Sequence, residues 1–99
     1  MRCLRCQRLL GESERVASMS GSINGDEHTD VYFLCPHCGV YTVGRWWDDF
    51  TGVESESVDG PLAREEGDAR VALIRGCATP WDKKCRCPAH RAYFGDGLD

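Results

Sequence analysis

Two Cys-x-x-Cys motifs constrain the fold of this chain more than any other feature. They are Cys3 with Cys6 and Cys35 with Cys38, and 28 residues separate them. Each motif presents two thiolates from one tight turn, so the pair supplies a tetrahedral four-sulfur shell of the kind that binds Zn²⁺. A lone motif is weak evidence, but two at this spacing are hard to explain as buried apolar cysteines. We therefore predict a fold that is held together by a metal ion.

The remaining cysteines predict a second metal site. Cys77, Cys85 and Cys87 are followed by His90 three positions later. Three thiolates and one imidazole complete another tetrahedral shell. This interpretation uses all seven cysteines, and we expect zinc at both sites. The alternative is that Cys77 is an ordinary buried residue at a helix end and the other three lie close together by chance.

Length and cysteine content support metal rather than disulfide stabilisation. A chain of 99 residues is one domain in which an apolar core alone is marginal. A structural zinc contributes on the order of 10 kcal/mol of folding free energy. An odd number of cysteines argues against a complete disulfide set, which stays the minor alternative. Met1 and Arg2 lead directly into a ligand, with no room for a secretory signal, and no apolar run reaches membrane-spanning length, so we expect a cytoplasmic protein without a membrane partner.

The first half of the chain has the pattern of antiparallel strands. Residues 30–34 and 40–43 are rich in β-formers and flank the second cysteine motif, so they predict the two arms of a hairpin. Residues 15–19 predict a third strand. The polar stretch 20–29, which contains Asn-Gly, is interpreted as its connection to the hairpin.

The second half combines a loop and a helix. Residues 46–60 show no clean period and predict a strand end followed by a connecting loop. Helix signals extend over 61–75, with the start nearer residue 65 if Gly67 disrupts the first turn. A short strand over 70–75 is the alternative. Four small or apolar residues would share one face of the helix: Ala69, Ala72, Leu73 and Gly76.

The paired motifs and the residues between them resemble the zinc-ribbon and rubredoxin-like families over residues 1–47. The resemblance implies two knuckles that clamp one metal between β-hairpins, with the four cysteines as ligands. Gly39 follows the second knuckle as the family pattern requires. The first knuckle departs from it, because Gln7 stands where a glycine commonly follows the second cysteine.

The expected fold is therefore a small, metal-stabilised α+β domain over residues 1–99. Its parts are a zinc ribbon in 1–47, an acidic loop and one short helix in 48–76, and a C-terminal metal motif in 77–99 that pins the tail. A site with four protein ligands has no open position for a reactive water, and the zinc-deaminase signature is absent, so we expect no enzyme. His37 and His28 are expected to be solvated, neither a ligand nor a catalytic base.

The leading functional hypothesis is a protein-interaction module. Trp46 and Trp47 would point to opposite faces of a strand, which leaves one indole available to a partner, although both could seal the core instead. Residues 48–68 hold eight acids against Arg64 alone, which suggests an acidic face for a basic partner. The formal charge is −4, and two thiolate-bound zinc ions would bring it to about −7.

Two other hypotheses remain open. Zinc ribbons of this kind occur often in transcription and translation machinery, and basic residues surround both metal motifs, which would suit nucleic acid despite the acidic total. A rubredoxin-like four-cysteine site can hold iron for electron transfer, and the C-terminal cluster could hold iron–sulfur. The basic residues are Arg2, Arg5 and Arg8 at the first motif and Lys83, Lys84, Arg86 and Arg91 at the last.

Overall fold

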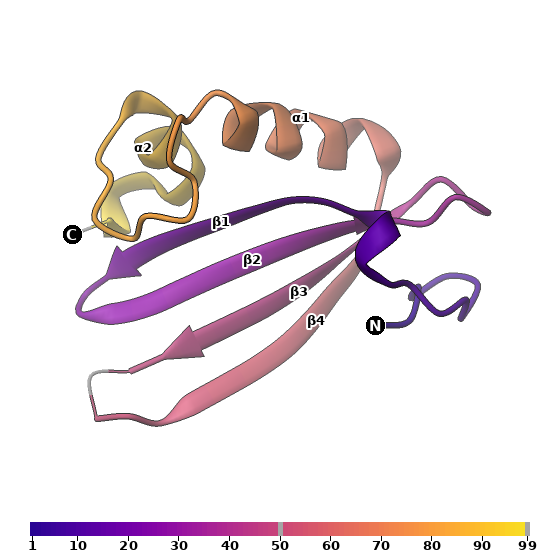
Figure 1. Cartoon of the computed structure of the whole chain (residues 1–99), viewed down its shortest axis with the longest axis horizontal. Helices are drawn as coiled ribbons and strands as arrows, with labels where there is room; N and C mark the ends of the chain where they lie inside the picture. Colours follow the sequence, from indigo (N-terminus) through magenta and orange to yellow (C-terminus); the bar gives the residue numbers. More distant parts are fainter. Residues whose placement is uncertain (50, 99) are drawn as a thin grey trace.

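A computed structural model describes residues 1–49 and 51–98 of the chain. One antiparallel sheet has the strand order β1-β2-β3-β4, and helices α1 and α2 lie on the β1 side of it (Figure 1). A small α+β fold is therefore confirmed. The strands are β1 (Arg15–Ile23), β2 (Asp26–Leu34), β3 (Tyr41–Asp48) and β4 (Glu54–Leu62), and the helices are α1 (Arg64–Arg75) and α2 (Pro88–Phe94), with short 3-10 helices at Glu12–Glu14 and Gly95–Gly97.

The β1–β2 hairpin is longer than predicted. Ile23 pairs with Asp26 around a two-residue turn in which Asn24 and Gly25 have φ values of 52° and 87°. Two positive φ angles are typical of a type I′ turn, whose twist matches that of the flanking strands. The polar stretch 20–29 is therefore not a loop, because its residues form the ends of both strands.

Of the prediction for residues 46–60, the strand end is confirmed and the connecting loop is largely wrong. β3 continues to Asp48, and β4 occupies most of the remainder. Among the described strands β4 has β3 as its only neighbour, and six of its nine residues are exposed. An edge strand with little burial needs no apolar alternation, so its sequence lacks the signal on which strand prediction depends.

Helix α1 begins at Arg64, close to the start that Gly67 suggested, and the alternative strand over 70–75 is wrong. The face that packs on the sheet consists of Gly67, Val71 and Ile74, whereas Ala72 and Leu73 are exposed. A Cβ atom at residue 67 would clash with Cδ2 of the Tyr41 ring. Glycine therefore allows the helix to approach β3 closely.

The main core lies between α1 and the sheet. Met19, Tyr32, Tyr41 and Val43 of the strands meet Val71, Ile74 and Cys77 there. The side chains of α2 cover the same face further along, where Phe94 lies directly over Gly21. The opposite face of the sheet carries no helix among the described residues. The two large tryptophans of β3 divide between the faces as predicted, since Trp47 stacks on His28 and Trp46 belongs to the alternate set.

Candidate metal centres

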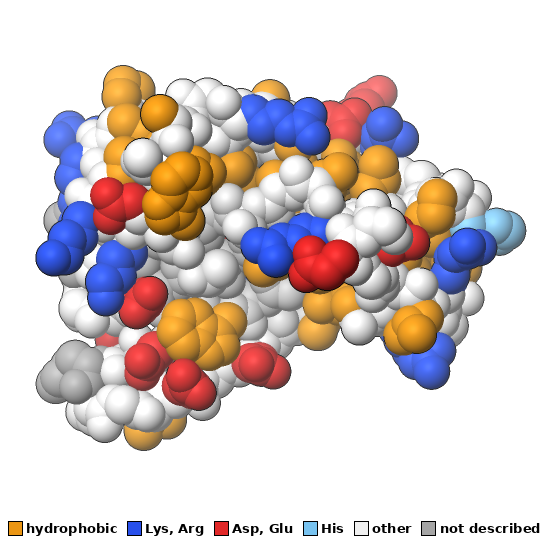
Figure 2. Space-filling model, viewed as in Figure 1, with side chains coloured by type: hydrophobic (Ala, Val, Ile, Leu, Met, Phe, Trp, Pro, Cys, Tyr) orange, Lys and Arg blue, Asp and Glu red, His pale blue; other side chains and the backbone are white. Residues whose placement is uncertain are grey.

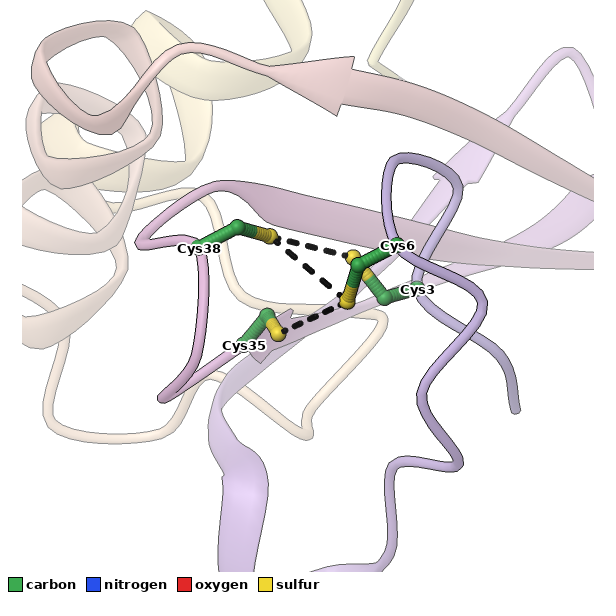
Figure 3. A group of neighbouring side chains, drawn as sticks. All are labelled: Cys3, Cys6, Cys35 and Cys38. Atoms are coloured by element: carbon green, nitrogen blue, oxygen red, sulfur yellow. Dashed lines mark hydrogen bonds between the residues drawn. The ribbon is translucent and has the colours of Figure 1, made fainter.

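The first cysteine cluster lies at the end of the sheet where β2 passes into β3. Cys3 and Cys6 come from an N-terminal turn, and Cys35 and Cys38 come from the β2–β3 connection, with all four side chains turned toward one point (Figure 3). The Sγ atoms of Cys3 and Cys38 are 3.4 Å apart, those of Cys6 and Cys35 3.6 Å, and those of Cys6 and Cys38 3.9 Å. A tetrahedral ion with 2.3 Å metal–sulfur bonds separates its sulfurs by about 3.8 Å. The cluster therefore has the size of a shell around one ion.

The two turns that carry these cysteines have the same backbone geometry. In the first, Gln7 N–H donates to the Cys3 carbonyl and Cys3 N–H donates to Arg8, each over 2.9 Å. In the second, Gly39 N–H donates to the Cys35 carbonyl over 2.9 Å, and Cys35 N–H donates to Val40 over 3.0 Å. Gln7 has a φ of 66° and Gly39 a φ of 70°. Gln7 thus adopts the left-handed conformation that glycine takes in the second turn.

Backbone amides stabilise negative charge on part of the first cluster. Burial acts to raise the pKa of Cys3, but hydrogen bonds from the backbone of Cys6 and Arg5 and from neighbouring sulfurs outweigh it and lower the pKa to about 6. Burial and the sulfurs of Cys3 and Cys35 raise the pKa of Cys38 to about 12. Four sulfurs in this space cannot all carry charge without a cation, which is the electrostatic condition that a bound metal relieves.

The second cluster lies at the opposite end of α1. Cys77 follows that helix, Cys85 and Cys87 come from the loop before α2, and His90 lies within α2. The Sγ atoms of Cys77 and Cys85 are 3.8 Å apart, and His90 Nδ1 lies 3.2 Å from Cys77 Sγ and 3.5 Å from Cys87 Sγ. Metal–sulfur and metal–nitrogen bonds of 2.3 and 2.0–2.1 Å give sulfur–nitrogen separations of about 3.5 Å. This cluster also fits one tetrahedral ion.

A contact with the sheet orients the imidazole of His90. Its Nε2 lies 2.9 Å from the carbonyl oxygen of Ser20 in β1, and the ring is fully buried. A carbonyl only accepts hydrogen bonds, so Nε2 carries the proton and donates. In the neutral imidazole Nδ1 is then the unprotonated nitrogen, and it is the atom that faces the sulfurs. A metal-binding histidine is commonly held in this way by its other nitrogen.

Local backbone structure positions the sulfurs of the second cluster. The N–H of Thr79 donates to Cys77 Sγ, and that of His90 donates to Cys87 Sγ, both over 3.4 Å. Cys87 is the N-cap of α2, and the following Pro88 occupies the first turn. Hydrogen bonding from the backbone of Cys87 lowers the pKa of Cys85, whereas burial raises that of Cys77. The motif is therefore a helix start as well as a ligand set.

The structure brings the sequence-predicted residues together in the two predicted groups. Each group offers four ligand atoms within 4.8 Å of one another: Cys3, Cys6, Cys35 and Cys38 in one, and Cys77, Cys85, Cys87 and His90 in the other. All seven cysteines are free, which disagrees with the disulfide alternative. His37 is exposed and belongs to neither cluster. His28 does not lie in a loop, because it is part of β2 and stacks on Trp47 with ring centroids 6.4 Å apart.

Two parts of the site were missed from sequence. Helix α2 was not predicted, although Cys87 followed by Pro88 is a recognisable helix start. The carbonyl of Ser20 that orients His90 lies 70 residues away in the chain, and no sequence signal marks it.

The chain has no counterpart among the proteins with which it was compared. No family model, no curated protein and no solved structure matches it. Among the described residues, no helix is both long enough and apolar enough to cross a membrane.

Proposed function

We propose that both clusters hold structural zinc and that the protein serves as a protein-interaction module. One observation carries the structural role: each cluster offers four protein ligand atoms at separations suited to a single tetrahedral ion. Such a closed shell leaves no coordination position for a substrate or a reactive water. The metal would then act through folding, by joining segments that are distant in sequence.

The distances between the ligand atoms favour a single zinc ion over an iron–sulfur cluster. An iron–sulfur cluster places bridging sulfides between the irons, so its cysteine ligands spread further apart than those around one ion. The separations of 3.4–3.9 Å in the first cluster and of 3.2–3.8 Å in the second suit a single ion. Mononuclear iron in a rubredoxin-like site needs the same sulfur geometry as zinc. The metal content and the absorption spectrum therefore distinguish iron from zinc.

The surface supports a protein partner more than a nucleic acid. Several basic side chains near the metal motifs bind carbonyl groups of their own loops: Arg2 binds Gln7, Arg86 binds Lys83 and Cys85, and Arg91 binds Arg86. These guanidinium groups complete the loops and are less free to contact phosphates. Acidic side chains gather over the ends of β3 and β4 on the face shown in Figure 2, which suits a basic protein surface.

Elemental analysis and an absorption spectrum of protein purified without added metal test this proposal. We expect two zinc equivalents per chain and no visible colour. One zinc equivalent would leave the second cluster without a metal role, and a coloured protein that contains iron would make electron transfer the better interpretation. A cooperatively folded chain without metal would overturn the structural role of both clusters.

A further inference from the structure

The two edges of the sheet differ in how they are covered. At the β1 edge, Ser20 N–H donates to the carbonyl of Pro80 over 2.8 Å, and the Ser20 carbonyl accepts from His90. Ile23 also forms a bridge with Leu98. β4, at the other edge, pairs only with β3, and no further backbone hydrogen bond to residues 54–62 is found in the described part of the chain. β4 therefore presents an uncovered row of outward-facing backbone donors and acceptors, except that Pro61 has no N–H to donate.

The uncovered strand has a uniform charge. Residues 46–63 contain five acidic residues and no lysine or arginine. Glu54 and Glu56 are exposed, and neither belongs to an ion pair of the described residues. Asp59 is the acid of β4 that has a cationic partner among the described residues, since its Oδ2 lies 3.0 Å from Nε of Arg45. The free edge therefore attracts basic groups rather than balanced or acidic ones.

An apolar hollow adjoins the acidic side chains. Glu54, Glu56 and Val58 alternate along β4, so they project from the same face of the sheet, the one that carries no helix. Val58 is 48% exposed and borders a hollow of about 290 Å³. The apolar and glycine residues that line the hollow are Met1, Val31, Phe33, Gly44, Trp46 and Val58. Polar and charged residues at Arg15, Arg45, Glu56 and Ser57 complete the lining, so the apolar part of the hollow is the part beside Val58 and Trp46.

We propose that β4 is the docking edge for an extended, basic segment of another protein, which adds to the sheet as a fifth strand. This inference deepens the proposed interaction function and rests on it. Main-chain hydrogen bonds supply the affinity of such strand addition, and alternate side chains supply its specificity. The partner carries two basic residues at alternate positions, opposite Glu54 and Glu56, and an apolar residue two positions further along, beside Val58.

A peptide of defined sequence tests the docking edge. The probe is the blocked peptide Thr-Val-Thr-Lys-Thr-Lys-Thr, and its control has proline in place of the two threonines that flank the first lysine, which keeps the charge but prevents strand pairing. Binding to the zinc-loaded, isotope-labelled full chain is followed by NMR. We expect shift changes and slower amide exchange confined to β4 and the hollow for the probe, and no binding of the proline control.

Matched charge variants separate the strand from the general acidity of the chain. Glu54→Lys with Glu56→Lys reverses two charges on β4, and Glu65→Lys with Glu66→Lys reverses two on the exposed first turn of α1. We expect the β4 pair to weaken probe binding about tenfold, because two opposite-charge cross-strand contacts become like-charge contacts. The α1 pair should leave the affinity within about twofold.

Four results would overturn the inference. Equal weakening by both charge pairs would mean unspecific attraction, and equal binding of the proline control would exclude strand pairing. Self-association of the β4 variant without peptide would mean that the acids serve to keep copies of this chain apart at the edge. Metal content is measured for each variant. A chain that contains no zinc would refute the proposed function. A zinc-loaded chain that does not bind the peptide would refute this inference alone.

Discussion

At the scale of single residues, Gln7 and Gly39 are the most informative pair. They occupy equivalent positions in two turns with the same hydrogen bonds and nearly the same positive φ. A non-glycine residue in the left-handed region costs about 1–2 kcal/mol relative to its usual conformation. The first turn has the geometry of the second without a glycine, and hydrogen bonds of Gln7 N–H to Cys3 and of Cys3 N–H to Arg8 close it.

This equivalence predicts opposite effects of two substitutions. Gln7→Gly should raise the free energy of unfolding of the metal-loaded protein by up to about 1 kcal/mol, because it removes the conformational cost. Gly39→Ala should lower it by about 1 kcal/mol. No atom lies within 4 Å of a Cβ at residue 39, so the second effect is conformational and not steric. Chemical denaturation measures both, and effects of the same sign would contradict the equivalence of the two turns.

The carboxylate of Asp68 predicts a pH-dependent contribution to stability. The hydroxyl of Tyr41 donates to Asp68 Oδ1 over 2.6 Å, and this bond, with help from Arg64, lowers the pKa of the Asp68 carboxyl. A carboxyl with a lowered folded-state pKa contributes stability above its ordinary pKa of about 3.9 and loses it as the pH falls through the lowered value. Burial and Asp68 raise the pKa of Tyr41, so its hydroxyl remains a donor at neutral pH.

We therefore expect Asp68→Asn to unfold at lower denaturant concentration than the natural chain between pH 5 and 8. The difference should be constant in that range and shrink only below about pH 4. Acid also displaces the metal from both proteins, so the readout is the difference between them. Tyr41→Phe, which removes the donor, should reproduce the loss at neutral pH. A difference that grows on acidification would exclude the charged carboxylate as its source.

At the level of helices and strands, the packing of α1 on β3 explains why the helix contains a glycine at position 67. The sequence suggests only a defect in a helix, at a cost of about 1 kcal/mol relative to alanine. In the fold, the same glycine is a buried contact that makes room for the ring of Tyr41. The helix accepts a poor helix former because a larger residue would separate it from the sheet.

Gly67→Ala should therefore destabilise the protein even though alanine favours helix. Overpacking of a core costs about 1–3 kcal/mol, and the gain in helix propensity offsets about 1 kcal/mol of that. The matched control is Ala69→Gly on the exposed side of α1, which should cost about 1 kcal/mol through propensity alone. Thermal and chemical denaturation give both values. If Gly67→Ala were stabilising, the ring of Tyr41 would not restrict the approach of the helix.

At the scale of the whole molecule, the two candidate metal centres join segments that the sheet alone does not connect. The first joins the N-terminal turn to the β2–β3 connection, where the local apolar cluster consists of Leu10, Phe33, Val40 and the cysteines themselves. The second joins the end of α1 to α2 and, through His90, to the β1 edge. At the second site, Tyr93 adds a hydrogen bond to Asp30, and Phe94 packs over Gly21.

Loss of a ligand should therefore have different consequences at the two ends. We expect Cys35→Ser to abolish the cooperative unfolding transition, because a structural zinc contributes about as much free energy as a small domain has in total. His90→Ala should release one metal equivalent and leave a weakened but cooperative transition, since contacts of α2 with the sheet remain. The controls are His37→Ala and His28→Ala, which remove imidazoles outside both clusters.

Metal content and circular dichroism of the four variants check this prediction. A native-like transition in Cys35→Ser would contradict the four-cysteine assignment. Retention of two metal equivalents in His90→Ala would remove His90 from its shell.

Features that depend on residues close together in the chain could be predicted from the sequence. The spacing of Cys3 with Cys6 and of Cys35 with Cys38 predicted which sulfurs meet, and the β-formers beside the second motif predicted the hairpin that carries it. Ligand spacing and turn residues act over a few positions, so they are visible without a fold. The second cluster was predicted from the three remaining cysteines and from the position of His90 three residues after the last of them, and its four members do come together.

Long-range packing decided the rest. β4 is a strand because β3 supplies hydrogen bonds to it. Its polar sequence has no alternation of apolar and polar residues from which a strand could be predicted. The proton on Nε2 of His90 is determined by Ser20, which only the packing of α2 on β1 brings within reach. The packing face of α1 and the role of Gly67 depend in the same way on Tyr41. These features arise from contacts between residues far apart in the chain. Local sequence patterns do not predict such contacts.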